Sequence, residues 1–346
     1  MKFLYINTRN IFPHDRHIID GLKENGHKVI ELEENSPGMK KYSNLAKYLK
    51  REVVKYDAIF VGFTSPFFVP IARIFSKNRI IYNATSSQYE GNIVSRGISP
   101  FSFEAMKWWL IDFISFHLAS LVLLESPSQI KYIGRNWLVK RNKLILSWSG
   151  LNEKEYYYEP NVSKYSKFTV LFRGRFLPES GIDTVIKVAK ILEDSDIAFL
   201  IIGHGFSYRL VNTLMDELKP KNIVMINHSL PIDELRKKMQ ASHISLGQMA
   251  DHPRLERTLP CKSFESLAMR LPYLTARNKA VLELLKEDET CLCSKPGDPR
   301  DLADKILFLK NRPEILELVA KNGYEFYRQN LTSKILADNL IRKCFA

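Results

Sequence analysis

The chain has 346 residues, which favours two domains, and its apolar share of 45% is that of a globular protein. Its Phe, Tyr, Leu and Ile content excludes a disordered chain, and 15 Gly and 16 Pro exclude a collagen-like one. The net charge is +13, and residues 1–150 hold 21 of the basic and 12 of the acidic residues. This excess fits an anionic membrane surface, a phosphorylated substrate or nucleic acid, and equally a merely soluble surface.

The first half of the sequence predicts alternating strands and helices. Strands are expected over 2–6, 27–32, 57–63, 79–82, 120–124 and 143–147, and helices over 15–25 and 42–55. The N-terminal apolar run is too short for a signal peptide. The most apolar stretch, 108–124, carries Asp112 and His117, so it is interpreted as a helix followed by a strand rather than a membrane span.

A polar segment over 152–167 precedes a second alternating series. Strands are expected over 168–173, 198–202, 222–226, 243–246 and 273–276, with helices over 183–192, 207–218, 233–240, 262–269, 298–310, 313–328 and 332–345. The pattern predicts an α/β protein with two Rossmann-like halves, each with a parallel sheet that binds ligands at the carboxyl ends of its strands.

The four cysteines are too few for a disulfide framework, and no pair has Cys-x-x-Cys spacing. No His lies near the two closest ones, which argues against a zinc site. Reduced thiols in a cytoplasmic protein are therefore expected. The cysteines are Cys261, Cys291, Cys293 and Cys344.

Glycines follow two of the predicted strands. The first strand lacks a Gly-x-Gly-x-x-Gly fingerprint, but Gly203-His-Gly205 follows the strand over 198–202. The two glycines permit either a simple turn or a close backbone approach to a ligand. Gly174-Arg175 follows the strand over 168–173, and its Arg is either a phosphate ligand or a surface residue beside a turn.

The segment 259–272 carries the most chemical information. Pro260 is expected just before or at a helix start, where unpaired N–H groups suit a phosphate and Lys262 adds a positive charge. Glu265 is expected in the first turn, facing outward, where its carboxylate can accept two hydrogen bonds from ribose hydroxyls. The alternative is a Glu favoured there by the helix dipole alone.

Lys262-x-Phe-Glu265-x-Leu-Ala268-x-x-x-Pro272, then 282–285 and 296–299, resembles the retaining glycosyltransferases of family 4, which have the GT-B fold. Gly174-Arg175, Gly181 and Gly203-x-Gly205 match the same family in the same order, as do 21–29 and 149–152 more loosely. The resemblance implies an N-terminal acceptor-binding domain (1–150), a nucleotide-sugar-binding domain (151–330) and a final helix (331–346) that packs back on the first domain, with the two domains facing across a cleft.

The resemblance also implies roles for individual residues. Glu265 would hold the ribose of a UDP- or GDP-sugar, and Gly203 and Gly205 would let backbone approach the nucleotide. Transfer to an acceptor hydroxyl would retain the anomeric configuration without a metal ion. The diphosphate would meet Arg175, Lys262, Gly174 and backbone around Thr258 to Ser263, including Pro260, while Glu256 would stand in for a catalytic Glu.

Four positions depart from the family pattern: Ser180 replaces a Lys, Arg257 a Glu, and Arg270 a Gly, and the segment near Thr64 lacks a His. These departures leave a catalytically silent nucleotide-binding or scaffold protein as the alternative. A nucleic-acid-binding protein ranks last, because no recognised module is present.

The expected acceptor is a glycan or lipid-linked precursor, and the basic first domain makes peripheral association with the inner face of a membrane a further expectation. Trp108, Trp109 and Phe113 are either interfacial anchors or buried packing residues. The candidate basic contact face is Lys40, Lys41, Lys47, Lys50, Arg51 and Lys55.

Overall fold

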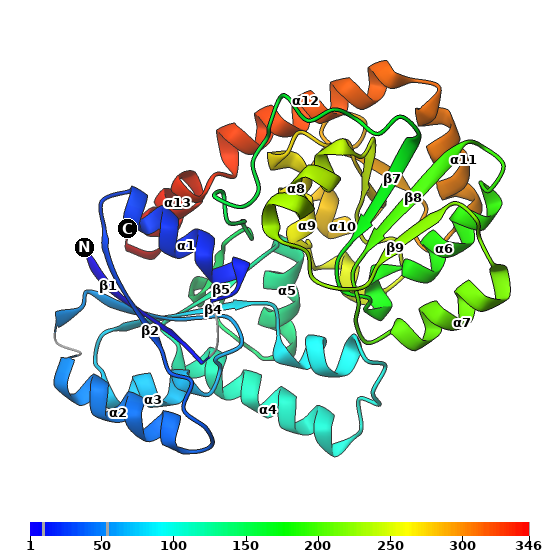
Figure 1. The fold of residues 1–346 in the computed structure, drawn as a ribbon. Coiled ribbons are helices and arrows are strands. Elements are labelled where there is room, and N and C mark those ends of the chain that lie inside the picture. Colours follow the sequence, from blue (N-terminus) through cyan, green and yellow to red (C-terminus); the bar gives the residue numbers. More distant parts are fainter. Residues whose placement is uncertain (9–10, 53–54, 346) are drawn as a thin grey trace. The chain divides into compact units, whose positions relative to one another are not determined.

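The computed structural model describes residues 1–8, 11–52 and 55–345, and the chain forms two compact units. The first unit is Met1–Asn152 together with Leu331–Ala346, and the second is Glu153–Asn330. The structural boundary therefore falls two residues after the expected one. Figure 1 shows a twisted sheet with helices packed against it in each unit.

The first unit contains a six-stranded parallel sheet in the order β2-β1-β3-β4-β5-β6. The strands are β1 (Lys2–Asn7), β2 (Lys28–Glu33), β3 (Ala58–Val61), β4 (Arg79–Thr85), β5 (Leu121–Leu124) and β6 (Leu144–Leu146). The helices are α1 (Pro13–Glu24), α2 (Lys40–Glu52), α3 (Phe68–Phe75), a π-helix (Glu90–Val94), α4 (Phe103–Leu118), α5 (Pro127–Asn136), a 3₁₀ turn (Arg141–Lys143) and α13 (Ser333–Phe345). The expected helix over 42–55 included residues 53–54, which lie outside the described residues.

Strand β1 shows why these segments are sheet. Its alternate side chains enter two separate buried clusters, with Leu4 and Ile6 on one face and Phe3 and Tyr5 on the other. A parallel strand that is covered on both faces is apolar along its whole length, which explains the unbroken apolar runs in the sequence. The C-terminal helix α13 packs so closely against α1 that a Cβ on Gly21 would lie 2.0 Å from the carbonyl oxygen of Ser333.

The second unit repeats the architecture with a parallel sheet in the order β12-β11-β10-β7-β8-β9. Its strands are β7 (Phe168–Arg173), β8 (Ile197–Ile202), β9 (Ile223–Ile226), β10 (Ile244–Leu246), β11 (Tyr273–Ala276) and β12 (Leu292–Ser294). Its α-helices are α6 (Ile182–Ile191), α7 (Tyr208–Leu218), α8 (Ile232–Ala241), α9 (Cys261–Ala268), α10 (Lys279–Leu282), α11 (Pro299–Lys310) and α12 (Pro313–Asn330). The predicted α/β class with two Rossmann-like halves is confirmed.

The strand order reverses once in each sheet. The chain runs from β1 outward to β2 and then returns to β3 on the other side of β1, and β7 and β10 have the same relation. Neighbouring loops at such a switch point leave in opposite directions and open a crevice at the carboxyl ends of the strands. The two switch points are therefore the places to search for ligand-binding side chains.

The stretch 108–124 is the end of α4 followed by β5, as expected from the sequence. Over the described residues, no helix is both long and apolar enough to cross a membrane.

Candidate functional site

The switch point of the second unit lies between the ends of β7 and β10. Gly174 follows β7, Gly247 follows β10, and the side chain of Lys262 from the first turn of α9 reaches both. Its Nζ donates to the Gly247 carbonyl oxygen at 3.3 Å and lies 4.3 Å from the centre of the Phe172 ring. A Cβ on Gly174 would be 3.4 Å from the same ammonium.

The Lys262 ammonium is held in an unfavourable environment. The residue is 8% exposed, and its burial, together with the nearby Arg173 guanidinium, lowers its pKa to about 7, although Glu265 opposes the shift. A buried cation with few hydrogen-bond acceptors gains more from an added anion than an exposed one does. The arrangement therefore suits a phosphate group at the end of β7.

The expected outward orientation of Glu265 is wrong. The helix begins at Cys261, so Glu265 lies beyond its first turn, and the residue is 3% exposed. Its Oε2 accepts a hydrogen bond from Arg173 Nη1, and over the described part of the chain Oε1 has no partner. One carboxylate oxygen therefore holds the guanidinium.

Arg173 and Tyr156 are site residues that the sequence did not indicate. Arg173 is the last residue of β7, and its Nη2 donates to the Tyr156 hydroxyl at 2.7 Å. Burial raises the pKa of Tyr156 above its ordinary value, and the Glu265 carboxylate adds to the effect. The position of Arg173 at the carboxyl end of the first strand of a unit was the available signal, because that is where α/β sheets bind ligands.

The glycines after β7 and β8 bring two loops together. Gly203 has a φ of 155°, and a Cβ there would lie 1.9 Å from the Gly174 carbonyl oxygen. Similarly, a Cβ on Gly205 would lie 2.8 Å from the Phe176 amide nitrogen. In this structure the close approach permitted by these glycines is between two protein backbones. The adjoining Arg175 is exposed.

The start of α9 agrees with the expected place of Pro260 before the helix. Pro260 is the residue before the helix, with extended backbone angles. Ser263 is 1% exposed, its hydroxyl donates to the Tyr273 hydroxyl at 2.8 Å, and its N–H bonds the Pro260 carbonyl. Ser263 therefore secures the helix to β11.

The Glu256 position is exposed at the end of a 3₁₀ turn (Pro253–Glu256). The preceding Arg254 pairs with the buried Glu179 at 2.5 Å, which anchors the turn to the loop before α6. Beside that loop Ser180 is fully buried, and its hydroxyl donates to the Leu177 carbonyl at 2.6 Å. The serine that replaces a family lysine thus has a local structural role.

The Arg270 departure has a local cause. Arg270 has a φ of 54° and follows α9, its N–H bonds the Leu267 carbonyl and the next N–H bonds Ser266. This is the pattern of a helix C-terminus that ordinarily favours glycine. The side chain pairs with Glu317 and contacts the Tyr158 ring, so the arginine gains contacts that a glycine would lack.

The switch point of the first unit holds a second polar cluster, which the sequence did not indicate. Asp15 of α1 is fully buried, and its Oδ1 accepts from the Tyr5 hydroxyl, the Phe63 amide and the Asn83 amide group at 2.7–2.9 Å. Burial raises its pKa to about 6 against these hydrogen bonds. His14 lies beside it, with its ring centre 4.8 Å from that of Phe63. An imidazole from α1 therefore adjoins the segment around Thr64 that lacks a histidine.

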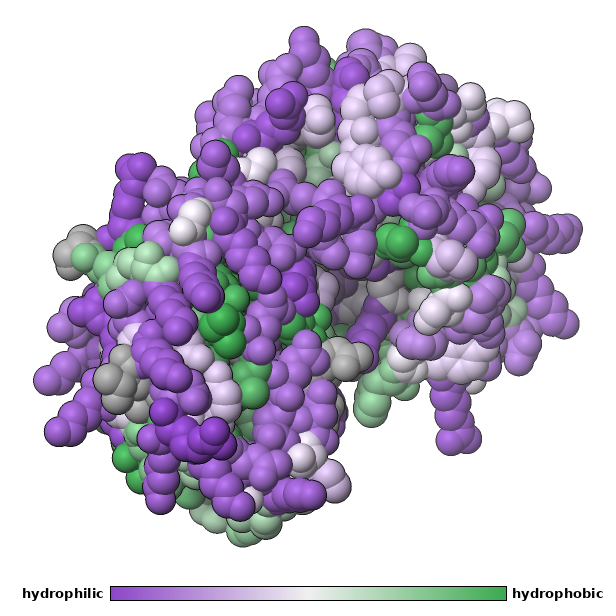
Figure 2. All heavy atoms as spheres, turned by 60° about the vertical axis from the view of Figure 1, so that its left-hand side comes forward, coloured by the Kyte–Doolittle hydropathy of each residue, from purple (hydrophilic) through white to green (hydrophobic). Residues whose placement is uncertain are grey.

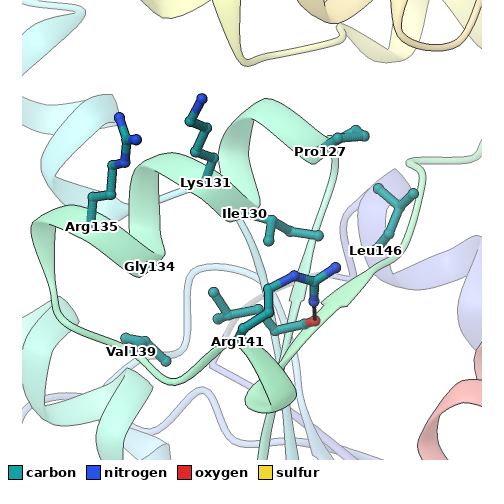
Figure 3. Close-up of a pocket in the computed structure, with 9 residues that line it drawn as sticks. Pro127, Ile130, Lys131, Gly134, Arg135, Val139, Arg141 and Leu146 are labelled. Atoms are coloured by element: carbon teal, nitrogen blue, oxygen red, sulfur yellow. Dashed lines mark hydrogen bonds between the residues drawn. The ribbon is translucent and has the colours of Figure 1, made fainter.

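A cavity of about 450 Å³ lies between α5 and the edge strand β6 (Figure 3). Lys131 and Arg135 extend from the outer side of α5, and Arg141 donates to the Leu144 carbonyl at 2.8 Å. The remaining lining is apolar or glycine: Pro127, Ile130, Gly134, Val139, Leu144 and Leu146. The lining suits a ligand with an anionic group beside an apolar part.

Among the described residues, no group of three or more His, Cys, Asp and Glu side chains is placed to hold a metal ion.

Comparison with known proteins is consistent with these features. The profile of a family described as "Glycosyl transferases group 1" matches residues 154–326, half of the chain. An uncharacterized glycosyltransferase from Methanocaldococcus jannaschii is 27% identical over 192 residues, which are 55% of this chain and 50% of the relative. The capsular polysaccharide biosynthesis glycosyltransferase CapM of Staphylococcus aureus is 23% identical over 257 residues, 69% of this chain and 64% of that protein. The chain thus spans between half and two thirds of the length of these relatives.

The fold is shared more widely than the sequence. The crystal structure of Anabaena HepE in complex with UDP has a TM-score of 0.75 with this chain at 14% identity and covers 99% of both chains. At that identity the likeness shows the fold, which is the GT-B fold that the sequence predicted. The profile match, which covers half of the chain, shows that the chain belongs to the glycosyl transferases group 1 family.

Proposed function

We propose that the protein is a retaining glycosyltransferase that moves a sugar from a nucleotide-diphosphate sugar to an acceptor hydroxyl without a metal ion. The observation that carries the proposal is the buried Lys262 ammonium between Gly174 and Gly247 at the switch point of the second unit. It supplies a positive charge where β7 ends, beside the N-terminus of α9.

The neighbouring residues have complementary roles in this proposal. Lys262 and the exposed Arg175 bind the diphosphate and stabilise the negative charge that develops as it leaves. Glu265, held by Arg173, accepts a hydrogen bond from the ribose through its second oxygen. Glu256 and the backbone near Pro260 lie on the loop that precedes α9 and contact the sugar or the diphosphate.

The acceptor class is a glycan or a lipid-linked precursor. The cavity beside α5, with Lys131 and Arg135 at its rim and an apolar floor, supports an acceptor with a phosphate next to an apolar chain. UDP is the first donor nucleotide to test, because HepE was solved with it, and GDP is the second.

The test is calorimetric titration with UDP and GDP, followed by a transfer assay in which NMR follows the anomeric proton of the product. Binding of one nucleotide and a product with the anomeric configuration of the donor support the proposal. Product of inverted configuration contradicts retention.

A catalytically silent relative is the second candidate, and the buried Ser180 at a family lysine position favours it. Nucleotide binding without transfer to any acceptor of a glycan and lipid-phosphate panel identifies this case. Failure of both nucleotides to bind contradicts the proposed donor class.

A further inference from the structure

The geometry points to a membrane-docking surface on the first unit: we propose that one face of α4, with the residues that adjoin it, binds the surface of an anionic lipid bilayer. The α4 face is formed by exposed apolar side chains from the loop before α4, from α4 itself and from the segment after α5. These residues are Phe101, Phe103, Met106, Trp109, Leu110 and Leu138.

The α4 face is unusually apolar for a surface. Phe101 is 97% exposed, Phe103 75% and Met106 59%. Residues 103, 106 and 110 recur at helical spacing on one side of α4, while its other side buries residues such as Ala105 and Phe116. Figure 2 shows a mostly hydrophilic surface with several separate apolar spots on the first unit, one of them at its lower edge, where Figure 1 places α2 to α4. Contiguous exposed apolar side chains mark binding surfaces.

Leu138 is a separate indication that apolar side chains are kept exposed on the α4 face. It is 78% exposed and has a φ of 55°, a backbone conformation that a leucine adopts at an energetic cost. It follows Trp137, whose indole nitrogen donates to the Trp109 carbonyl at 3.0 Å and whose ring stacks on that of Trp109. Leu138 therefore adjoins the apolar side chains of α4.

Positive charge dominates the segment of the chain that carries these apolar side chains. Segment 96–143 holds seven basic and three acidic residues. Two of the acids, Asp112 and Glu125, are buried, and the third, Glu104, pairs with Lys107. The exposed cations on α5 and after it are Lys131, Arg135, Lys140 and Arg141.

An anionic bilayer complements both features of the α4 face. Aromatic and aliphatic side chains enter the boundary between headgroups and acyl chains, and nearby Lys and Arg side chains pair with lipid phosphates. A protein partner would not require this excess of positive charge in the segment that carries the apolar side chains. The α4 face is a different surface from the lysine-rich face of α2 that the sequence suggested. Of the three aromatic residues named as interfacial anchors, Trp109 is 37% exposed and belongs to the α4 face, whereas Trp108 and Phe113 are half-buried.

The proposal extends the proposed function, because binding to a bilayer would bring the protein to a lipid-linked acceptor. It rests on the proposed function in this respect alone. Its test measures lipid binding directly, so it can fail while nucleotide binding and transfer to a soluble acceptor succeed, and the reverse is equally possible.

The experiment is sedimentation of the full chain with phosphatidylcholine vesicles, with and without phosphatidylglycerol. We expect binding to the anionic vesicles that weakens with added salt. Phe101→Ser combined with Phe103→Ser should reduce the partition coefficient roughly 100-fold. Leu138→Gly should weaken binding and raise the melting temperature, because it removes an exposed apolar group and relieves the positive φ.

The matched control is Phe206→Ser with Leu210→Gln, since these residues of the second unit are 66% and 51% exposed. The control should bind vesicles like the wild type. The proposal is overturned if the wild type fails to sediment with either vesicle, or if the control loses as much binding as the Phe101 and Phe103 variant. It is also overturned if size-exclusion chromatography with light scattering shows that the Phe101→Ser and Phe103→Ser substitutions dissociate an oligomer while vesicle binding is unchanged.

Discussion

Replacing Lys262 by Met removes a buried ammonium and keeps an unbranched side chain of similar length. The wild-type pKa of about 7, against an ordinary 10.5, corresponds to about 4–5 kcal/mol against the charged form. Local relaxation recovers part of this, so we expect Lys262→Met to raise the free energy of unfolding by about 2 kcal/mol at pH 7. For a unit of this size the melting temperature should rise by about 5 °C.

The same substitution should weaken binding of the nucleoside diphosphate. A charge-assisted hydrogen bond contributes about 1.5–3 kcal/mol, so the dissociation constant should increase by roughly 10- to 100-fold. A gain in stability with a loss of affinity is the signature of a binding residue in an unfavourable position, and a residue needed only for packing would lose stability.

The dependence on pH follows from the same group. The folded-state pKa lies below the unfolded value, so between about pH 7 and 10.5 the unfolded chain binds more protons and wild-type stability rises with pH. The bound diphosphate favours the charged ammonium, so wild-type affinity should fall as pH rises above 7. Lys262→Met should show neither dependence on this account.

Calorimetric titration at pH 6.5, 7.5 and 8.5, with thermal unfolding of the unliganded protein, provides the measurements. Lys187→Met is the control, because this lysine forms an exposed pair with Asp183 at 3.1 Å and should contribute less than about 1 kcal/mol. Unchanged affinity in Lys262→Met, together with a lower melting temperature, would refute the reasoning.

Three further predictions concern other groups. Glu265→Ala should destabilise the second unit by about 3–5 kcal/mol, because it removes the carboxylate partner of the Arg173 guanidinium, and Glu265→Gln should be milder. Urea unfolding measures both variants, and equal stability of Glu265→Ala and wild type would count against the buried pair. Asp15→Asn should stabilise the protein by roughly 1–3 kcal/mol at pH 7 but little at pH 4. The reason is that burial raises the pKa of the Asp15 carboxyl to about 6, so the wild-type protein loses stability as pH rises from 4 to 6. Denaturant unfolding at both pH values measures this, and the same gain at both would argue against the raised pKa. Transfer activity should persist in excess EDTA, and activity that is lost on chelation and restored by Mg²⁺ or Mn²⁺ would contradict the metal-independent mechanism.

The burial of Glu265 also changes what the Glu265→Ala variant measures. An outward-facing glutamate at a helix start would affect stability by only about 0.3–1 kcal/mol. Because Glu265 is buried and paired with Arg173, loss of affinity in the Ala variant mixes binding with folding. Comparison of Glu265→Gln with wild type is therefore the cleaner measure of its contact with the ribose.

Some motifs that predicted the family have structural roles. Gly297 has a φ of 65°, and the Asp298 side chain accepts from the N–H groups of Arg300 and Asp301 at the start of α11. Such a side chain satisfies helix N–H groups that lack an intrahelical partner. The 296–299 motif thus identifies the family through a helix start, far along the chain from Lys262.

Local sequence features determined the elements that carry strong signals. Strands 168–173 and 273–276 have the predicted ends, since each is apolar and bounded by Gly or Pro. Helices α3 and α5 and strand β12 were missed. For α5 a usable signal was present, because Ser126 caps the helix by accepting from the Gln129 amide at 2.8 Å and Pro127 begins it.

The sequence by itself determined that the chain forms two parallel sheets, and that a lysine and a glutamate follow a helix start in the second half. Only the tertiary structure decided where those side chains point. Arg173 and Glu265 are separated by 92 positions and meet because β7 and β10 pair and side chains of α9 reach the ends of both strands. Helical periodicity shows which residues share a face but not which neighbour covers it. Burial, the lowered pKa of Lys262 and the orientation of Glu265 therefore arise from packing between segments distant in the chain.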